Sequence, residues 1–143
     1  MLTVSFYDNI DDNLLKFAVI ISKTKGKWVF CKHKERNTYE VPGGHRDEYE
    51  TILEAAEREL REETGAVDFT IKPVCVYSVK GKTRVNDNYD ETFGMLYYAD
   101  IYKFEELHSE IEKIIFTDSL DIEWTYPRIQ PKLIEEAKRR NII

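Results

Sequence analysis

The amino-acid sequence predicts a single domain of the mixed α/β class. The chain has 143 residues, which is the size of one ordinary domain and enough to bury a sizeable core. Short apolar runs rich in β-branched residues indicate several strands, and two stretches with helical periodicity lie among them. Because a turn signal joins two of these strands as a hairpin, the sheet should not be purely parallel.

The first part of the chain is predicted to supply strands. The turn signal KTKG (23–26) joins the second predicted strand to the third, and the last one ends in a Pro-Gly-Gly loop. The predicted strands are LTVSFY (2–7), KFAVIIS (16–22), KWVFCKH (27–33) and the short YEVPGG (39–44).

The clearest predicted helix covers residues 51–64. Thr51 and Glu54 form a Thr-x-x-Glu capping box, in which each side chain satisfies a free backbone amide at the helix start. Gly65 can adopt the left-handed conformation that ends a helix.

The second part is predicted to contain two further strands and a last helix. The strands are DFTIKPVCVYSV (68–79) and TFGMLYYADI (92–101), with a polar, turn-rich segment (80–91) between them. Residues 103–112 are expected to form a short helix or an irregular connection, and 122–126 a short extended segment. Pro127 should open a helix over about residues 128–140.

Composition narrows the classes of function. The formal net charge of −6 argues against a protein that grips nucleic acid through a broad basic face. It leaves a nucleotide substrate open, because a divalent cation can supply positive charge. No window approaches a membrane-spanning length, and the N-terminus lacks the basic and apolar regions of a signal peptide. With Cys31 and Cys75 expected as reduced, partly buried thiols, a cytoplasmic protein is predicted.

The acidic residues of helix 51–64 divide between two faces. At about 100° per residue, Glu59, Glu62 and Glu63 fall within about 100° of one another, on the arc that also carries Ala55 and Ala56. The opposite side, which is expected to be solvated, carries Glu54, Glu57, Arg58 and Arg61.

Carboxylates on a partly buried face are costly unless something compensates their charge. A hard divalent cation does so, because carboxylate oxygens are its preferred ligands. Gly43 and Gly44, just upstream, permit close approach of the backbone, although they also suit a plain turn. This geometry favours a metal site over a merely solvated face.

Gly44, Glu50 and the run RELREETG (58–65) occur at a fixed spacing within residues 44–66. This stretch resembles the Nudix box of the Nudix (MutT-type) hydrolases, whose fixed polar and glycine positions it matches. The chain departs from the pattern at Ala66, where a bulky aliphatic residue is usual, and at Tyr49, where many members have glycine.

The resemblance implies an α/β/α sandwich with a mixed sheet, and hydrolysis of a nucleoside diphosphate linked to another group with Mg²⁺ or Mn²⁺. Carried over by position, Glu59, Glu62 and Glu63 would be the principal metal ligands, supported by Glu50 and by a backbone carbonyl at Gly44. Arg58 would orient the carboxylates through charge-assisted hydrogen bonds.

In the predicted reaction, water attacks a phosphorus atom of a pyrophosphate bridge with metal assistance. The general base is either Glu62 or an acid outside the box. Asp100 at the end of a strand is one candidate, although a strand-end cap explains it equally well, and Asp90 and Glu91 are others.

Contacts to substrate are less sharply indicated. Basic residues that could reach phosphates, or could simply be solvated, are Arg36, Lys80, Lys82 and Arg84. Aromatic residues that could stack on a base, or could belong to the core, are Tyr97, Tyr98, Trp124 and Tyr126. No role is assigned to His33, His45 or His108, which show no ligand spacing.

A nucleoside triphosphate, such as an oxidised guanine nucleotide, is the favoured substrate by analogy. ADP-ribose, dinucleoside polyphosphates and capped RNA ends remain alternatives. So do a non-catalytic domain that senses a nucleotide and a purely structural cation site.

Overall fold

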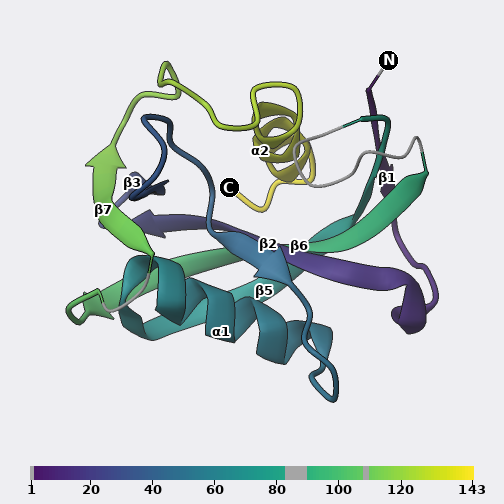
Figure 1. The fold of residues 1–143 in the computed structure, drawn as a ribbon, viewed down its shortest axis with the longest axis horizontal. Helices are drawn as coiled ribbons and strands as arrows, with labels where there is room; N and C mark the ends of the chain where they lie inside the picture. The colour runs from purple at the N-terminus through teal and green to yellow at the C-terminus, as the bar shows by residue number, and fades with distance from the viewer. Residues whose placement is uncertain (1, 83–89, 108–109) are drawn as a thin grey trace.

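The chain folds into a seven-stranded sheet with one α-helix on each face (Figure 1). The computed structural model describes residues 2–82, 90–107 and 110–143. Its strands are β1 (Thr3–Tyr7), β2 (Leu15–Thr24), β3 (Lys27–His33), β4 (Gly43–His45), β5 (Ala66–Lys80), β6 (Glu91–Phe104) and β7 (Ile111–Thr117). The helices are α1 (Ile52–Thr64), α2 (Gln130–Arg139) and the short 3-10 helix η1 (Asp12–Leu14).

The sheet is mixed, as the sequence predicts. The strand order is β1-β5-β6-β2-β3-β7, and β4 pairs with β2 beside this path. The central strands β2 and β6 run parallel, whereas β2 and β3 form an antiparallel hairpin. Lys25 and Gly26 in its turn have positive φ angles of 50° and 79°, the conformation that tight hairpin turns require.

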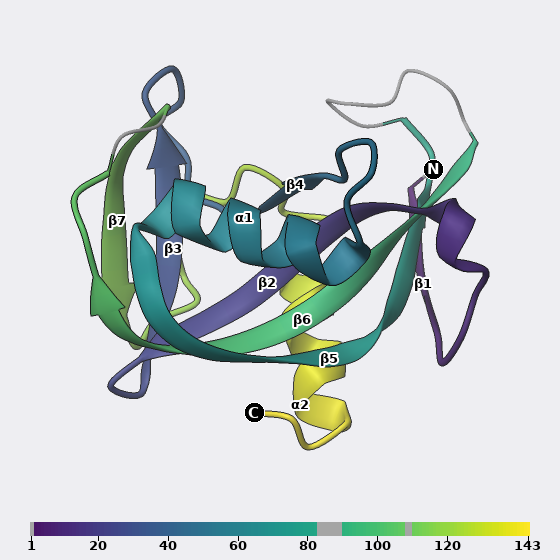
Figure 2. The same ribbon diagram turned by 90° about the horizontal axis from the view of Figure 1, so that it is seen from below.

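Segment 40–45 lies between β2 and β3, which pair only near their hairpin turn. Glu40 bridges to Cys31, Pro42 accepts a hydrogen bond from the amide of Ile20, and β4 completes the pairing with β2. Gly43 is so close to β2 that a Cβ there would lie 2.6 Å from the carbonyl oxygen of Ala18. The backbone of Gly43–His45 is thereby fixed beside α1, as Figure 2 shows.

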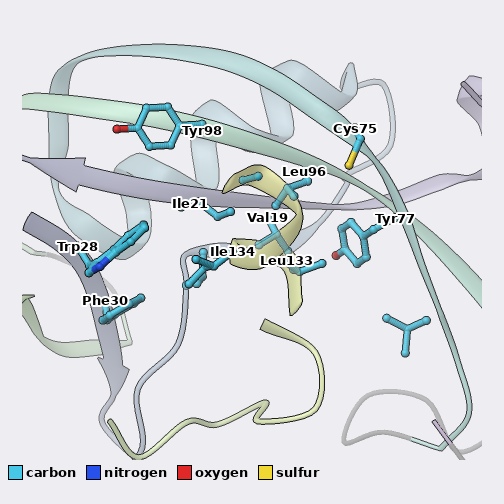
Figure 3. Close-up of a cluster of buried hydrophobic side chains, with 13 residues drawn as sticks. Val19, Ile21, Trp28, Phe30, Cys75, Tyr77, Leu96, Tyr98, Leu133 and Ile134 are labelled. Carbon is cyan, nitrogen blue, oxygen red and sulfur yellow. The ribbon is translucent and has the colours of Figure 1, made fainter. Parts of the chain in front are cut away.

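Two apolar clusters fill the spaces between the sheet and its helices. On the α1 side, Ala55, Ala56 and Leu60 pack against residues of the sheet such as Ile20 and Ile101. On the α2 side, Leu133, Ile134 and Ala137 pack against Val19, Tyr77 and Leu96 (Figure 3). The α/β/α sandwich is therefore confirmed.

Both predicted ends of α1 are confirmed. The Thr51 hydroxyl accepts from the Glu54 amide at 3.0 Å, and the Glu54 carboxylate accepts from the Thr51 amide at 2.9 Å. Gly65 ends the helix with a left-handed φ of 78°. A Cβ on Gly65 would also lie within 2.4 Å of the Glu105 carbonyl oxygen, and the Glu105 amide donates to the Gly65 carbonyl at 2.7 Å.

One prediction for the second half of the chain is partly wrong. Residues 105–107 form the expected irregular connection, but residues 103–104 end β6 and residues 111–112 begin β7, a strand that was not predicted. Its sequence IEKIIFT does not alternate, because it is an edge strand that buries little beyond Ile111. Residues 122–126 make a single bridge, from Trp124 to Tyr39, and α2 starts at Gln130, with proline in its first turn.

Two expectations from composition can also be compared with the structure. Cys31 and Cys75 are both buried as free thiols. In the part of the chain that the structure describes, no helix is long and apolar enough to cross a membrane.

Candidate functional site

The three glutamates that the helical phase groups together line one cavity. This carboxylate cavity has a volume of about 120 Å³. Its walls are formed by His33, Glu59, Glu62, Glu63, Glu110 and Ile111. Side chains from α1, the end of β3 and the start of β7 thus meet at one place.

Glu59 packs directly on the backbone of β4. A Cβ at Gly44 would lie 2.5 Å from Oε1 of Glu59, so only glycine leaves room for this carboxylate. The Glu59 side chain is 13% exposed. Burial raises its pKa to about 7, a shift that Glu62 and Glu63 reinforce and the hydrogen bond from Arg58 opposes.

Arg58 lies among the carboxylates and not on a solvated face, which corrects the helical-phase prediction. Its Nε donates to Glu50 at 2.7 Å and its Nη1 to Glu59 at 2.8 Å, with a longer contact of 3.4 Å to Glu62. Its Nη2 donates to the carbonyl of His45 at 2.9 Å. The long side chain reaches around the helix, so the position of its Cα does not decide where its charge lies.

Glu50 supports Arg58 and does not line the cavity. Its Oε1 accepts from the Asp47 amide at 2.9 Å and from Arg58 at 3.0 Å, and its Oε2 accepts from Nε of Arg58. The hydrogen bonds from Arg58 lower the pKa of Glu50 to about 2. Glu50 is thus an ionised partner that fixes the guanidinium.

Glu63 is the most buried of the three cavity carboxylates. Its Oε1 accepts from the Gly43 amide at 2.8 Å, and its Oε2 lies 3.2 Å from Nε2 of His33. Burial raises the pKa of Glu63, against the opposing effect of the His33 hydrogen bond. The hydrogen bond to Glu63 in turn raises the pKa of His33, although partial burial acts in the opposite direction.

The donor set fits a hard divalent cation. It consists of carboxylates, and burial raises the pKa values of two of them, Glu59 and Glu63. Among the described residues, no three His, Cys, Asp or Glu side chains are already arranged around a common ion. Glu59 and Glu63 are instead held by Arg58, Gly43 and His33.

A second cavity, of about 140 Å³, lies on the α2 side of β4. We call it the apolar cavity. Its apolar walls include Val41, Val79 and three residues that Figure 3 labels beside α2, namely Val19, Tyr77 and Leu133. Its polar groups include Glu40, Tyr126 and Gln130. Gly43, Gly44 and His45 also line it, so β4 separates the two cavities by little more than one strand.

Comparison with known proteins assigns the chain to a family. Residues 13–139 fit the model of the family described as NUDIX domain. The chain belongs to the Nudix family.

Individual Nudix relatives agree with this assignment. A Bacillus subtilis protein named as a candidate 8-oxo-dGTP diphosphatase, YtkD, is 37% identical over 103 residues, which cover 72% of this chain and 61% of that relative. The matched region thus spans less than two thirds of the relative's length.

Solved Nudix structures resemble the whole fold. The crystal structure of the Bacillus subtilis pyrophosphohydrolase BsRppH, a mutant form, superposes with a TM-score of 0.77 at 27% identity, covering 96% of this chain and 90% of that one. The NUDIX domain of Shewanella oneidensis NrtR, complexed with ADP ribose, gives a TM-score of 0.70 at 19% identity and covers 93% and 94% of the two chains. The latter likeness concerns the fold alone.

Several residues predicted from sequence lie away from the carboxylate cavity. Asp100 shares the α2 side of β6 with Tyr98, whose hydroxyl donates to it at 2.8 Å, so it is not a base in this cavity. Glu91 accepts from Tyr7 and Ser78. Asp90 does not line either cavity.

The predicted phosphate contacts are not gathered at the carboxylates either. Lys80 and Lys82 are exposed at and just after the end of β5, and Arg84 lies outside the described residues. Arg36 donates to Glu40 at 2.7 Å. Of the aromatic candidates, only Tyr126 lines the apolar cavity.

Two residues of the site were missed by sequence reasoning. His33 was given no role, because its partner Glu63 is 30 positions away and no ligand spacing reveals the contact. Glu110 lies in a segment for which the sequence predicts a helix or irregular connection, so no position near the site was predicted for it. In the structure it immediately precedes β7 and lines the carboxylate cavity.

Proposed function

We propose that this protein is a metal-dependent pyrophosphohydrolase that cleaves a phosphoric anhydride bond of a nucleoside triphosphate. Its main support is the carboxylate cavity, in which Glu59, Glu62 and Glu63 lie together beside the glycine backbone of β4. The relatedness to a named pyrophosphohydrolase at 27% identity supports the same reaction class.

The predicted cation is Mg²⁺ or Mn²⁺, held by Glu59, Glu62 and Glu63 with a backbone oxygen at Gly44. When bound, such an ion polarises phosphate oxygens and lowers the pKa of water. Glu50 keeps Arg58 in place, and Arg58 keeps Glu59 turned toward the cavity. Because Arg58 is shared among several carboxylates, it leaves negative charge for a cation to compensate.

A proton acceptor for the attacking water is available at the same cavity. Glu62 is half exposed and only loosely held by Arg58, at 3.4 Å, so it can turn toward water. Glu110 is an acid outside the Nudix box that lines this cavity, whereas Asp100 does not, so Glu110 is the second candidate for the base. Replacing the residue that acts as the base, Glu62 or Glu110, should shift the acidic limb of the pH–rate profile, because the base must be deprotonated to act. The basic limb should not change in either variant.

The apolar cavity is the proposed place for the nucleobase. It lies across β4 from the carboxylates, so a nucleotide in it could extend its phosphates toward the metal. Gln130 uses its Oε1 to accept from the Val41 amide at 2.8 Å, which turns the amide nitrogen toward other partners. Such a group, beside Tyr126, suits the polar edge of a purine.

An oxidised guanine nucleotide is the favoured substrate, because the relative YtkD is named as a candidate 8-oxo-dGTP diphosphatase. Dinucleoside polyphosphates and capped RNA ends are less favoured, since the net charge of −6 provides little attraction for additional phosphates. ADP-ribose is supported only by the fold of a domain that binds it.

The test is phosphate and pyrophosphate release from a panel of nucleotides, with Mg²⁺, with Mn²⁺ and with a chelator. Turnover should require the cation and should be greatest for a purine nucleoside triphosphate. Glu59→Gln and Glu63→Gln should each abolish it, while Glu57→Gln, on the same helix but outside the cavity, should not.

Other results would point to the remaining alternatives. Near-normal turnover in both cavity variants would contradict the metal-site assignment. Nucleotide binding without release of phosphate would indicate a sensing domain, and stabilisation by metal without turnover would indicate a structural cation site.

A further inference from the structure

His33 and Glu40 connect the two cavities. His33 lines the carboxylate cavity, and Glu40 lines the apolar cavity. The Nε2 atom of His33 lies 3.2 Å from Oε2 of Glu63 and 3.6 Å from Oε2 of Glu40. The imidazole therefore lies between a predicted metal ligand and a carboxylate that belongs to the other cavity.

Glu63 is held at both of its oxygens. The Gly43 amide donates to Oε1 at 2.8 Å, and His33 faces Oε2. A carboxylate oxygen accepts more than one bond, so each oxygen can keep its donor and still face a cation. The Gly43 donor belongs to a fixed strand, whereas the His33 donor sits on a side chain that must itself be oriented.

Glu40 is well placed to orient that side chain. It is only 6% exposed, and its backbone exchanges two hydrogen bonds of 2.9 Å with Cys31. Its Oε1 accepts from Arg36 at 2.7 Å, which leaves Oε2 facing His33. At 3.6 Å the contact with His33 is an electrostatic attraction and not a hydrogen bond.

Stability alone does not account for this group of charges. Glu40 is buried and its partner Arg36 is partly exposed, and such an ion pair generally contributes little compared with apolar residues of the same volume. By contrast, removal of a group that hydrogen-bonds to a metal ligand commonly lowers metal affinity or activity by about 10- to 100-fold.

We propose that Glu40 is a positioning residue of the metal site, which holds His33 in the orientation that fixes Glu63, and that Arg36 holds Glu40 in turn. This inference rests on the proposed function, since it assumes that Glu63 binds the cation.

The experiment measures Mn²⁺ binding by calorimetry in the absence of nucleotide, alongside steady-state kinetics. Glu40→Gln keeps the size of the side chain but removes its charge. It should weaken Mn²⁺ binding by about 10-fold or more and lower kcat, with KM for the nucleotide changed less than about two-fold. The matched control is Glu136→Gln, which changes another buried, arginine-paired glutamate that lines neither cavity and should leave Mn²⁺ affinity as in the wild type.

A double-mutant cycle tests whether Glu40 acts through His33. His33→Ala should weaken Mn²⁺ binding, and adding Glu40→Gln to it should cause no further loss. Independent losses that add would overturn the proposal. So would a Glu40→Gln variant in which only KM rises, because Glu40 would then act as a contact to the base.

Three outcomes need separate treatment. If Glu40→Gln does not fold, Glu40→Asp keeps the negative charge but withdraws the carboxylate from His33, and the same loss of Mn²⁺ affinity is expected. If the wild type binds no Mn²⁺, the proposed function fails together with this inference. If the wild type binds Mn²⁺ and the folded Glu40 variant binds it equally well, only this inference fails.

Discussion

The helices α1 and α2 cover opposite faces of the sheet, and each carries a largely buried glutamate in a different electrostatic setting. On α2, the Glu136 side chain is 8% exposed and accepts from Arg139 at 2.8 Å and from Arg140 at 2.7 Å. Its pKa falls to about 2, chiefly because of Arg139. On α1, the Glu59 side chain is 13% exposed, yet burial raises its pKa to about 7.

Burial causes most of the rise in the pKa of Glu59, and the ratio of cations to carboxylates adds to the contrast. Two arginines serve Glu136, whereas the single guanidinium of Arg58 is shared among Glu50, Glu59 and Glu62. Glu136 therefore contributes to stability as it stands, while Glu59 is destabilising until a further positive charge arrives. A helix face on which buried carboxylates lack enough cationic partners is a candidate binding site and not only a packing surface.

The largest expected effect is the opposite response of the two glutamates to loss of charge. Glu59→Gln should lower kcat/KM by about 100-fold or more, because a metal ligand contributes several kcal/mol to the transition state. The same variant should melt at a higher temperature than the wild type without metal, since a desolvated charge is removed. Glu136→Gln should keep its activity but lose about 1–3 kcal/mol of stability, because its hydrogen bonds lose their ionic character. Melting and turnover assays on both variants check this, and equal responses would remove the contrast.

Addition of Mg²⁺ should stabilise the protein by compensating the charge of the carboxylates on α1. At a concentration 100 times its Kd, the ion should stabilise the wild type by about 2.7 kcal/mol. In Glu136→Gln the increment should be the same, and in Glu59→Gln it should be much smaller. A melting temperature that saturating Mg²⁺ does not move would count against the metal site.

Low pH should reduce stability through Glu136 on α2. The folded-state pKa of Glu136 is about 2, below the ordinary glutamate value of 4.5, so the folded protein binds its proton less readily than the unfolded chain. The stability from Glu136 is therefore fully present above about pH 4.5 and is lost as the pH falls toward about 2. Chemical denaturation of the wild type and Glu136→Gln from pH 7 to pH 2 should show two curves that converge in acid. A constant difference between them would contradict this assignment.

The smallest effect concerns the loop that leads into α1. Tyr49 is 97% exposed and has a φ of 67°, which is unfavourable for a residue with a side chain. Tyr49→Gly should relieve that strain and stabilise the protein by up to about 1 kcal/mol, after the greater flexibility of glycine in the unfolded chain is allowed for. Tyr49→Ala, which keeps a Cβ, should show no such gain in a denaturation experiment. If both variants melt alike, φ strain at position 49 is not the cause.

Sequence predicts best the parts of this molecule that are set locally. The capping box of Thr51 and Glu54, the left-handed Gly65 and the carboxylate spacing all act within one helix, so α1 could be placed closely. Whether Asp100 shares a face of the sheet with the carboxylate cavity depends on which face α1 covers. The sequence near Asp100 does not indicate which face that is. His33 and Glu110 reach the cavity only through the pairing of β3 with β7, which joins residues some 80 positions apart, such as His33 and Ile111.

The hydrogen bond between Gly65 and Glu105 has a consequence for the order in which the site is assembled. This bond extends the antiparallel pairing of β5 with β6, in which Ala66 faces Phe104. Glu110 enters the cavity only with β7, which pairs with the more distant strand β3. Long-range pairing of this kind forms late, because a long loop must close before any contact compensates its entropy. We therefore expect the chain to acquire Glu59, Glu62 and Glu63 early in folding and Glu110 last, so that the cavity closes only when the sheet is complete.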